Sequence, residues 1–148
     1  MILQDVLRAK GSTVYAIRAE ATLQAALNEM LAHNVGSLLV EQQGASREEM
    51  PEGIITERDV LGACAAGGEA LASMRVGDVM TRELIFAAPE DDVAKTMSLM
   101  TRNRFRHVPV LSEGRVAGMV SMRDLVKAQL DQLALENRLM RDYIGGER

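Results

Sequence analysis

The chain of 148 residues is long enough for one compact domain, or for two small units that share a core. A net charge of −4 and an aromatic content of 3%, with no Trp, argue against a general nucleic-acid binder, since such proteins use basic surfaces and stacking side chains. A single cysteine, Cys64, excludes an intrachain disulfide framework. The opening residues show no signal-peptide pattern, and no run reaches the roughly 20 apolar residues that span a bilayer, so we expect a soluble cytoplasmic protein.

The first half of the chain predicts a strand, a helix, two further strands and a second helix. Val14–Arg18 is rich in β-forming residues, and Thr22 follows as a helix N-cap. Apolar residues then recur at helical spacing along one face: Leu23, Ala26, Leu27, Met30 and Leu31. The remaining elements are strands over Ser37–Glu41 and Gly53–Thr56 and a helix over Glu57–Ala66.

The second half predicts the same order. Leu84–Ala87 is its first strand, and Asp92 caps a helix that turns Val93, Met97 and Met100 inward. The remaining elements are strands over His107–Leu111 and Val116–Ser121, which pair across a glycine-containing turn, and a helix that begins near Arg123.

The two halves indicate an internal duplication. Thr22 to Asp92 is a step of 70 positions, whereas Asp59 to Asp124 is a step of 65. The difference of five residues between these steps arises in the loop Glu41–Glu52, which is longer than its counterpart in the second half. Duplicated units commonly pack about a pseudo-twofold axis that creates paired clefts, so the pattern favours binding over catalysis.

We expect the first repeat over residues 1–68, the second over 69–128 and a helical extension over 129–148. Residues of the tail follow a heptad spacing of 4, 3, 4, 3 and 4: Val126, Leu130, Leu133, Asn137, Met140 and Ile144. One interpretation is a dimerisation helix whose Asn fixes the register. The other is a helix that docks on its own domain, with Asn137 near the exposed edge.

Each repeat ends with the pattern Gly-apolar-apolar-Thr/Ser-x-Arg-Asp, at Gly53–Asp59 and Gly118–Asp124. A strand ends at the hydroxyl residue and a helix begins, which presents free backbone N–H groups to an anion. The pattern combines a hydroxyl donor, a guanidinium for phosphate and a carboxylate that can accept from ribose hydroxyls; these are Thr56, Arg58 and Asp59, and Ser121, Arg123 and Asp124. Together they predict a nucleotide site.

A purely structural alternative assigns the same residues to helix capping. Thr56 and Ser121 would then be N-caps, and the two aspartates would be first-turn carboxylates that favour the helix dipole. Many residue combinations cap a helix, so the occurrence of one combination in two otherwise diverged halves favours the binding interpretation.

The repeat order, the lead-in Asp78–Thr81, the segment Arg106–Val110 and the two hydroxyl-x-x-Asp endings resemble a tandem CBS-domain pair. This regulatory module is named after cystathionine β-synthase and is also called a Bateman module. The resemblance covers about residues 3–128, and the extra helix is similar to that of small stand-alone bacterial CBS-pair proteins. It implies an α+β fold of two β-α-β-β-α repeats packed about a pseudo-twofold axis, followed by a C-terminal helix.

The resemblance also implies clefts between the repeats that bind an adenosine compound: AMP, ADP or ATP, or else NAD(H) or S-adenosylmethionine. By this resemblance Asp59 and Asp124 take the ribose, and Thr56 and Ser121 lie beside ribose or phosphate. The adenine is expected against lead-in and first-strand residues, Thr81 and Ile85 in one repeat and Thr13 and Tyr15 in the other. Residues at the start of the inner strand are expected to read it through the backbone: Gly36, Ser37 and Leu38, and Arg106, His107, Val108 and Pro109.

The two sites are not expected to be equivalent. Arg104 fits a phosphate contact that crosses the pair, whereas the first repeat has Asn34 at the matching position and no proline in its inner strand. We therefore expect the cleft that uses Ser121 and Asp124 to be the better formed.

The expected function is a non-enzymatic regulatory module that binds an adenine nucleotide, forms a homodimer and acts on a partner protein in trans. One alternative is an interaction scaffold with vestigial clefts. Another is an enzyme acting on a nucleotide, for which the chain lacks a recognisable base, nucleophile or metal set. Two histidines, 74 positions apart, and one cysteine leave little material for a metal site, and we expect no nucleic-acid or membrane partner.

Overall fold

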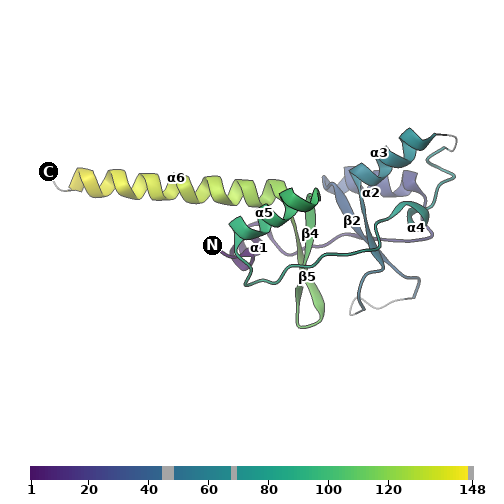
Figure 1. Ribbon diagram of the computed structural model, residues 1–148, viewed down its shortest axis with the longest axis horizontal. Coiled ribbons are helices and arrows are strands. Elements are labelled where there is room, and N and C mark those ends of the chain that lie inside the picture. The colour runs from purple at the N-terminus through teal and green to yellow at the C-terminus, as the bar shows by residue number, and fades with distance from the viewer. Residues whose placement is uncertain (45–48, 68–69, 147–148) are drawn as a thin grey trace. The chain divides into compact units, whose positions relative to one another are not determined.

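The computed structural model describes residues 1–44, 49–67 and 70–146 (Figure 1). Two compact units divide the chain. Unit 1 comprises Met1–Ser12, Phe86–Ser112 and Ala117–Arg148, and unit 2 comprises Thr13–Ile85 and Glu113–Val116. Part of the predicted long loop, residues 45–48, and the predicted repeat boundary at 68 and 69 lie outside the described residues.

Unit 2 contains the order of elements predicted for the first repeat. These are β1 (Ala16–Arg18), α2 (Leu23–His33), β2 (Ser37–Glu41), β3 (Gly53–Thr56) and α3 (Glu57–Ala66). A short helix that was not predicted, α4 (Val76–Val79), follows them in unit 2. β1 pairs with β2 in parallel and β2 pairs with β3 antiparallel, so β2 lies in the middle of a three-stranded sheet. The predicted bounds of β2, β3 and α3 are confirmed, whereas β1 is shorter than the predicted Val14–Arg18.

The apolar face of α2 packs into the core of unit 2. Thr22 caps the helix as predicted, since its side chain accepts a hydrogen bond from the Ala25 N–H at 3.1 Å. The buried residues of this face and of the sheet form one cluster: Leu23, Ala26, Met30, Leu38, Val40 and Ile55. Leu31, predicted for the same face, is 80% exposed, because eight residues of helix rotate it about 80° away from Leu23.

The remaining elements are α1 (Leu3–Lys10), α5 (Val93–Asn103), β4 (His107–Ser112), β5 (Arg115–Ser121) and α6 (Met122–Gly146). They belong to unit 1, except for the first two residues of β5, which are assigned to unit 2. Asp92 caps α5 as predicted, accepting from the Lys95 N–H at 3.0 Å. β4 and β5 form a two-stranded sheet across a turn in which Glu113 and Gly114 have φ of 52° and 77°, as type I′ hairpin turns require. The core includes Leu3, Val6, Leu7, Val93, Met100, Val108, Val110, Val120 and Leu125.

The lead-in segments that open the two repeats are exchanged between the compact units. α1 opens the first repeat in sequence but packs into the core of unit 1, together with residues of the second repeat. α4 lies near the start of the second repeat, but Val76 and the residue that follows the helix, Met80, pack into the core of unit 2. The predicted boundaries at 1–68 and 69–128 follow the sequence repeats, whereas the compact units follow this packing.

The predicted strand Leu84–Ala87 does not form. Only its last residue pairs, in a single parallel bridge with Val110. One more pair of residues toward the N-terminus would need a hydrogen bond from the N–H of residue 109 to the carbonyl oxygen of Ile85. Pro109 has no N–H to donate. In unit 2 the matching donor is the N–H of Leu39, which donates to the carbonyl oxygen of Tyr15 at 3.1 Å. Pro109 therefore accounts for the missing strand.

α6 docks on unit 1 only through its first turns. Leu125 is fully buried, and Met122 and Ala128 pack against the same core. Every residue from Leu133 to Gly146 is exposed. The interpretation of the tail as a helix docked on its own domain is therefore wrong for this stretch, where the seam residues have no core to cover them in the described part of the chain.

Close backbone packing at Gly53 generates a stability prediction. A Cβ atom there would lie 2.7 Å from the Thr81 carbonyl oxygen and 2.9 Å from the Met80 sulfur. Gly53→Ala should therefore destabilise the protein by about 1–3 kcal/mol. Gly62→Ala is the matched control, because nothing lies within 4 Å of its added Cβ in the middle of α3; it should stabilise by about 0.5–1 kcal/mol. Urea unfolding of both variants checks the sign, and equal effects would contradict the packing at Gly53.

Candidate nucleotide-binding site

Both hydroxyl-x-x-Asp motifs form reciprocal caps at the junction of a strand and a helix. The Asp59 N–H donates to Thr56 Oγ1 at 3.3 Å, and the Thr56 N–H donates to Asp59 Oδ2 at 3.0 Å. The Asp124 N–H donates to Ser121 Oγ at 3.1 Å, and the Ser121 N–H donates to Asp124 Oδ2 at 2.8 Å. The capping interpretation is thus confirmed as geometry. It does not exclude binding, because a carboxylate has about four acceptor positions and the cap uses only part of them.

A second backbone contact repeats in both units. The N–H of Glu57, the first residue of α3, donates to the Gly36 carbonyl oxygen at 3.1 Å. The N–H of Met122, the first residue of α6, donates to the Arg106 carbonyl oxygen at 2.8 Å. Each contact holds the residue just before an inner strand at the N-terminus of the helix that carries the candidate carboxylate. Residues predicted for adenine and for ribose are therefore neighbours within each unit.

In unit 2 the lead-in of the second repeat reaches the carboxylate of the first. Thr81 and Ile54 exchange two backbone hydrogen bonds of 2.9 Å, and Thr81 Oγ1 donates to Asp59 Oδ1 at 3.2 Å. Ser37 is the strand partner of Thr56. The structure thus brings together five predicted site residues of unit 2: Gly36, Ser37, Thr56, Asp59 and Thr81.

In unit 1 a lysine occupies the corresponding position at the carboxylate. Lys10, the last residue of α1, places its Nζ 2.6 Å from Asp124 Oδ2 and 2.8 Å from the Met119 carbonyl oxygen. Burial alone would raise the pKa of Asp124, but the Lys10 ammonium and the hydrogen bonds from Ser121 outweigh it and lower that pKa. The pair is partly open to solvent, with side chains 34% and 25% exposed.

Tyr15 is the one tyrosine among the predicted adenine contacts. Its ring stacks on His33, with centroids 3.8 Å apart and an interplanar angle of 12°. His33 also contacts Glu29 Oε2 at 3.1 Å. Sequence analysis missed both His33 and Lys10 as site neighbours. His33 lies 18 residues from Tyr15 in another element, and Lys10 lies 114 residues from Asp124, so no local pattern links either pair.

The other predicted site residues fall into two groups. Leu38, Val108 and Pro109 are buried, so their side chains belong to the core and only their backbone is available to a ligand. The exposed or partly exposed residues are Thr13, Arg58, Ile85, Arg104, Arg106, His107 and Arg123. Arg104 ends α5 in the left-handed conformation, with φ of 58°, as Asn34 ends α2 with φ of 53°. Their role in binding stays a prediction.

Each unit has a capped junction between a strand and a helix, and each contains the lead-in segment of the other repeat. These features define a tandem-repeat module. Comparison with known proteins identifies the repeat. Residues 5–66 and 76–131 each match the CBS domain, and the chain belongs to the CBS-domain family.

Three similar proteins, all with CBS domains, illustrate the comparison. A mitochondrial CBS-domain-containing protein of Arabidopsis thaliana is 37% identical over 97% of this chain and 72% of its own. The crystal structure of a CBS-domain-containing protein from Agrobacterium tumefaciens is 32% identical, with a TM-score of 0.80 over 87% of this chain and 99% of the other. A hexameric CBS-CP12 protein from bloom-forming cyanobacteria is 27% identical, with a TM-score of 0.72 over 85% of this chain and 69% of the other.

The described residues contain neither a cluster of metal ligands nor a helix that could span a membrane. Within ranges 1–44, 49–67 and 70–146, no group of three or more His, Cys, Asp or Glu side chains is placed to hold a metal ion. Among the helices of those ranges, none combines the length and apolar character needed to cross a membrane.

The lowered pKa of Asp124 generates a prediction about acid stability. A carboxyl whose pKa falls on folding stabilises the native state above its ordinary value of 3.8, and this stabilisation is lost as the pH falls through the folded-state value. Lys10→Met should therefore lower the free energy of unfolding at pH 7, by up to about 1 kcal/mol for a partly exposed pair, and by less near pH 3. Urea titrations from pH 7 to pH 3 measure the difference.

Lys127→Met is the control for this experiment. It removes an ion pair with Asp131 whose side chains are 77% and 68% exposed, so its effect should be smaller at every pH. An effect of Lys10→Met that does not change with pH would contradict the coupling to Asp124.

Proposed function

We propose that this protein is a regulatory, non-catalytic CBS-pair module that binds an adenine nucleotide and acts on a partner protein in trans in the cytoplasm. The observation that carries the proposal is the pair of capped carboxylates, Asp59 and Asp124, each held at a helix N-terminus beside the backbone that precedes an inner strand. A cis-diol of ribose can donate to such a carboxylate, and the positive end of the helix dipole favours a nearby phosphate.

The charges around the two carboxylates differ, and this difference supports a phosphorylated ligand at one of them. Lys10 neutralises Asp124, whereas Asp59 receives a hydrogen bond from the neutral hydroxyl of Thr81. When ribose hydroxyls donate to Asp124, the Lys10 ammonium becomes available to a nearby phosphate. AMP, ADP and ATP suit this site, whereas the positive sulfonium of S-adenosylmethionine suits the more negative surroundings of Asp59.

Regulation follows from differential binding. A ligand that favours one arrangement of the two units shifts the population that a partner protein recognises. The exposed free thiol of Cys64 is compatible with a reducing compartment. An interaction scaffold that needs no nucleotide is the second candidate, and the exposed apolar residues of α6 favour it.

The ribose assignment is tested by calorimetry on nucleotide-free protein. Asp124→Asn should weaken AMP binding at least tenfold, about 1.4 kcal/mol, because the ribose loses a charged acceptor. The amide oxygen can still accept from the Ser121 N–H, so the cap of α6 should survive. Removing the 2′-hydroxyl from AMP should weaken binding to wild-type protein and have little further effect in the variant.

Asp131→Asn provides a matched control, because Asp131 lies on the same helix and pairs only with the exposed Lys127 among the described residues. Asp59→Asn tests the other repeat in the same way. If wild-type protein, Asp59→Asn and Asp124→Asn all fail to bind AMP, ATP and NAD(H), the scaffold becomes the better explanation.

Lys10→Met distinguishes a phosphate contact made by Lys10 from the ribose contact made by Asp124. The ion pair competes with ribose for Asp124, so its loss should leave adenosine binding unchanged or stronger. The same substitution should weaken AMP relative to adenosine, because the phosphate loses a cation. The affinity for AMP divided by the affinity for adenosine, both measured by calorimetry, should fall at least threefold. An unchanged ratio would show that Lys10 does not contact the phosphate.

A further inference from the structure

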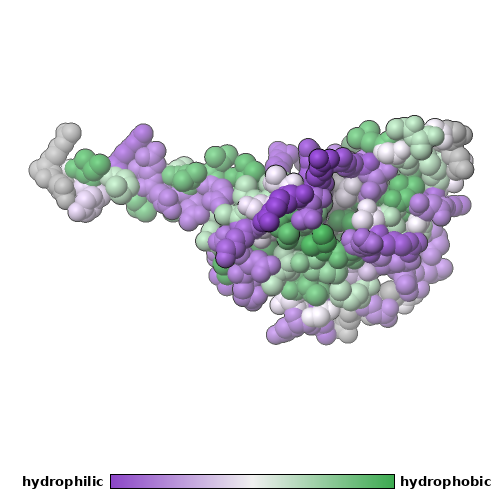
Figure 2. Space-filling view, in the orientation of Figure 1, coloured by the Kyte–Doolittle hydropathy of each residue, from purple (hydrophilic) through white to green (hydrophobic). Residues whose placement is uncertain are grey.

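From Leu130 onward, α6 exposes a seam of apolar side chains. Leu130, Leu133, Met140 and Ile144 are between 58% and 62% exposed. Figure 2 shows hydrophobic residues distributed along this helix among hydrophilic ones. Unit 1 leaves the seam uncovered in the described residues, and large apolar side chains in a row usually mark an interaction surface.

The heptad spacing of the seam residues is typical of a helix that packs against another helix. Leu130, Asn137 and Ile144 take the a positions of a heptad repeat, and Val126, Leu133 and Met140 take the d positions. In a parallel, in-register pair, a positions face a positions, so Asn137 meets its own copy and the two amides can hydrogen-bond. In an antiparallel pair a faces d, which would bury the Asn137 amide against Leu133 or Met140 without a partner.

The flanking charges favour the same arrangement. Glu136 is at a g position and Arg141 at the following e position, and in a parallel pair these two positions of opposite chains meet. In an antiparallel pair g positions lie beside g positions and e beside e, so Glu136 and Arg141 of opposite chains would be on opposite sides of the seam and could not pair. Charges between Val126 and Ile144 balance, with Lys127, Arg138 and Arg141 against Asp131, Glu136 and Asp142. Two copies therefore approach without net repulsion.

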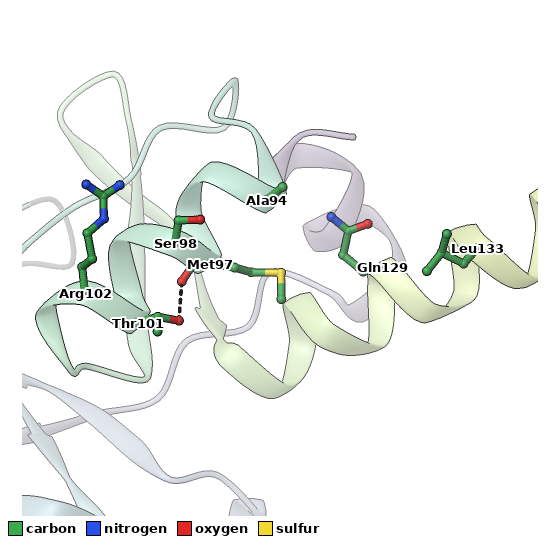
Figure 3. A pocket seen from close by; sticks show the side chains of 7 residues that line it. All are labelled: Ala94, Met97, Ser98, Thr101, Arg102, Gln129 and Leu133. Atoms are coloured by element: carbon green, nitrogen blue, oxygen red, sulfur yellow. Dashed lines mark hydrogen bonds between the residues drawn. The ribbon is translucent and has the colours of Figure 1, made fainter.

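A groove extends the seam at its N-terminal end. Its volume is about 620 Å³, and residues of α5 and α6 line it, including Met97, Gln129 and Leu133 (Figure 3). Leu133 belongs both to the groove and to the seam, so the groove adjoins the seam. From Leu130 to Ile144 the seam is only about 22 Å long, at 1.5 Å per residue, and a groove that adds contact area helps so short a coil to associate.

We propose that a second copy of this chain covers the seam, and that the two α6 helices form a parallel, in-register coiled coil from Val126 to Ile144. Asn137 pairs with its own copy at the centre, and Glu136 of each chain pairs with Arg141 of the other. The proposal does not depend on nucleotide binding, since none of these residues lies at either candidate carboxylate.

Cysteine cross-linking tests the arrangement directly. Cys64 is the only cysteine, so Cys64→Ser gives a thiol-free background. In that background Asn137→Cys should form an intermolecular disulfide on mild oxidation, because only a parallel, in-register pair brings the two 137 positions together. Arg138→Cys is the control, because its b position points away from the seam. Cross-linking at 138 equal to that at 137, or none at 137, would overturn the proposal.

The oligomeric state in solution tests the proposal without an introduced cysteine. Leu133→Lys should convert the dimer to monomer in analytical ultracentrifugation at tens of micromolar protein, because it places two like charges at facing d positions. Leu135→Lys is the matched control: Leu135 lies two residues away, is 45% exposed and takes an f position outside the seam. Circular dichroism confirms that both variants stay folded. A wild-type monomer, or a dimer that survives Leu133→Lys, would contradict the proposal.

Discussion

The carboxylate at the third position of a helix is the constraint on which both halves of this molecule depend. Asp59 and Asp124 each close a reciprocal cap with the hydroxyl residue that ends a strand. The cap fixes the direction in which the helix leaves the sheet and satisfies donors that would otherwise be unpaired. The candidate ligand acceptor is thus built into the fold, and its position is set before any ligand arrives.

The exchange of lead-in segments explains why two equivalent caps have different surroundings. α1 brings a lysine to Asp124, whereas the segment after α4 brings a threonine to Asp59. The two motifs share their Gly, Arg and Asp, and each has a hydroxyl residue at the same position. Duplication therefore preserved the carboxylate and left its charge environment to the segments that pack beside it, so two copies of one motif now have different electrostatic surroundings.

Local patterns were enough to predict most elements, because caps, turns and apolar periodicity act within a few residues. Thr22, Asp92 and the bounds of β2, β3 and α3 are examples. The predictions that were wrong or missing depend on residues that are far apart in the sequence. The strand at Leu84–Ala87 depends on a donor that Pro109 lacks, and Lys10 becomes a neighbour of Asp124 only after α1 packs on α6. Tertiary pairing of this kind leaves no trace in a window of sequence.

Pro109 also affects local dynamics. In unit 2 the carbonyl of Tyr15 is tied to the inner strand by the N–H of Leu39, and the matching bond is chemically unavailable to Ile85. Fewer backbone hydrogen bonds lower the free energy of local opening, so amide protons around Leu84–Ala87 should exchange with solvent faster than those of β1. One missing N–H thus gives two repeats of common origin unequal rigidity beside their candidate adenine contacts.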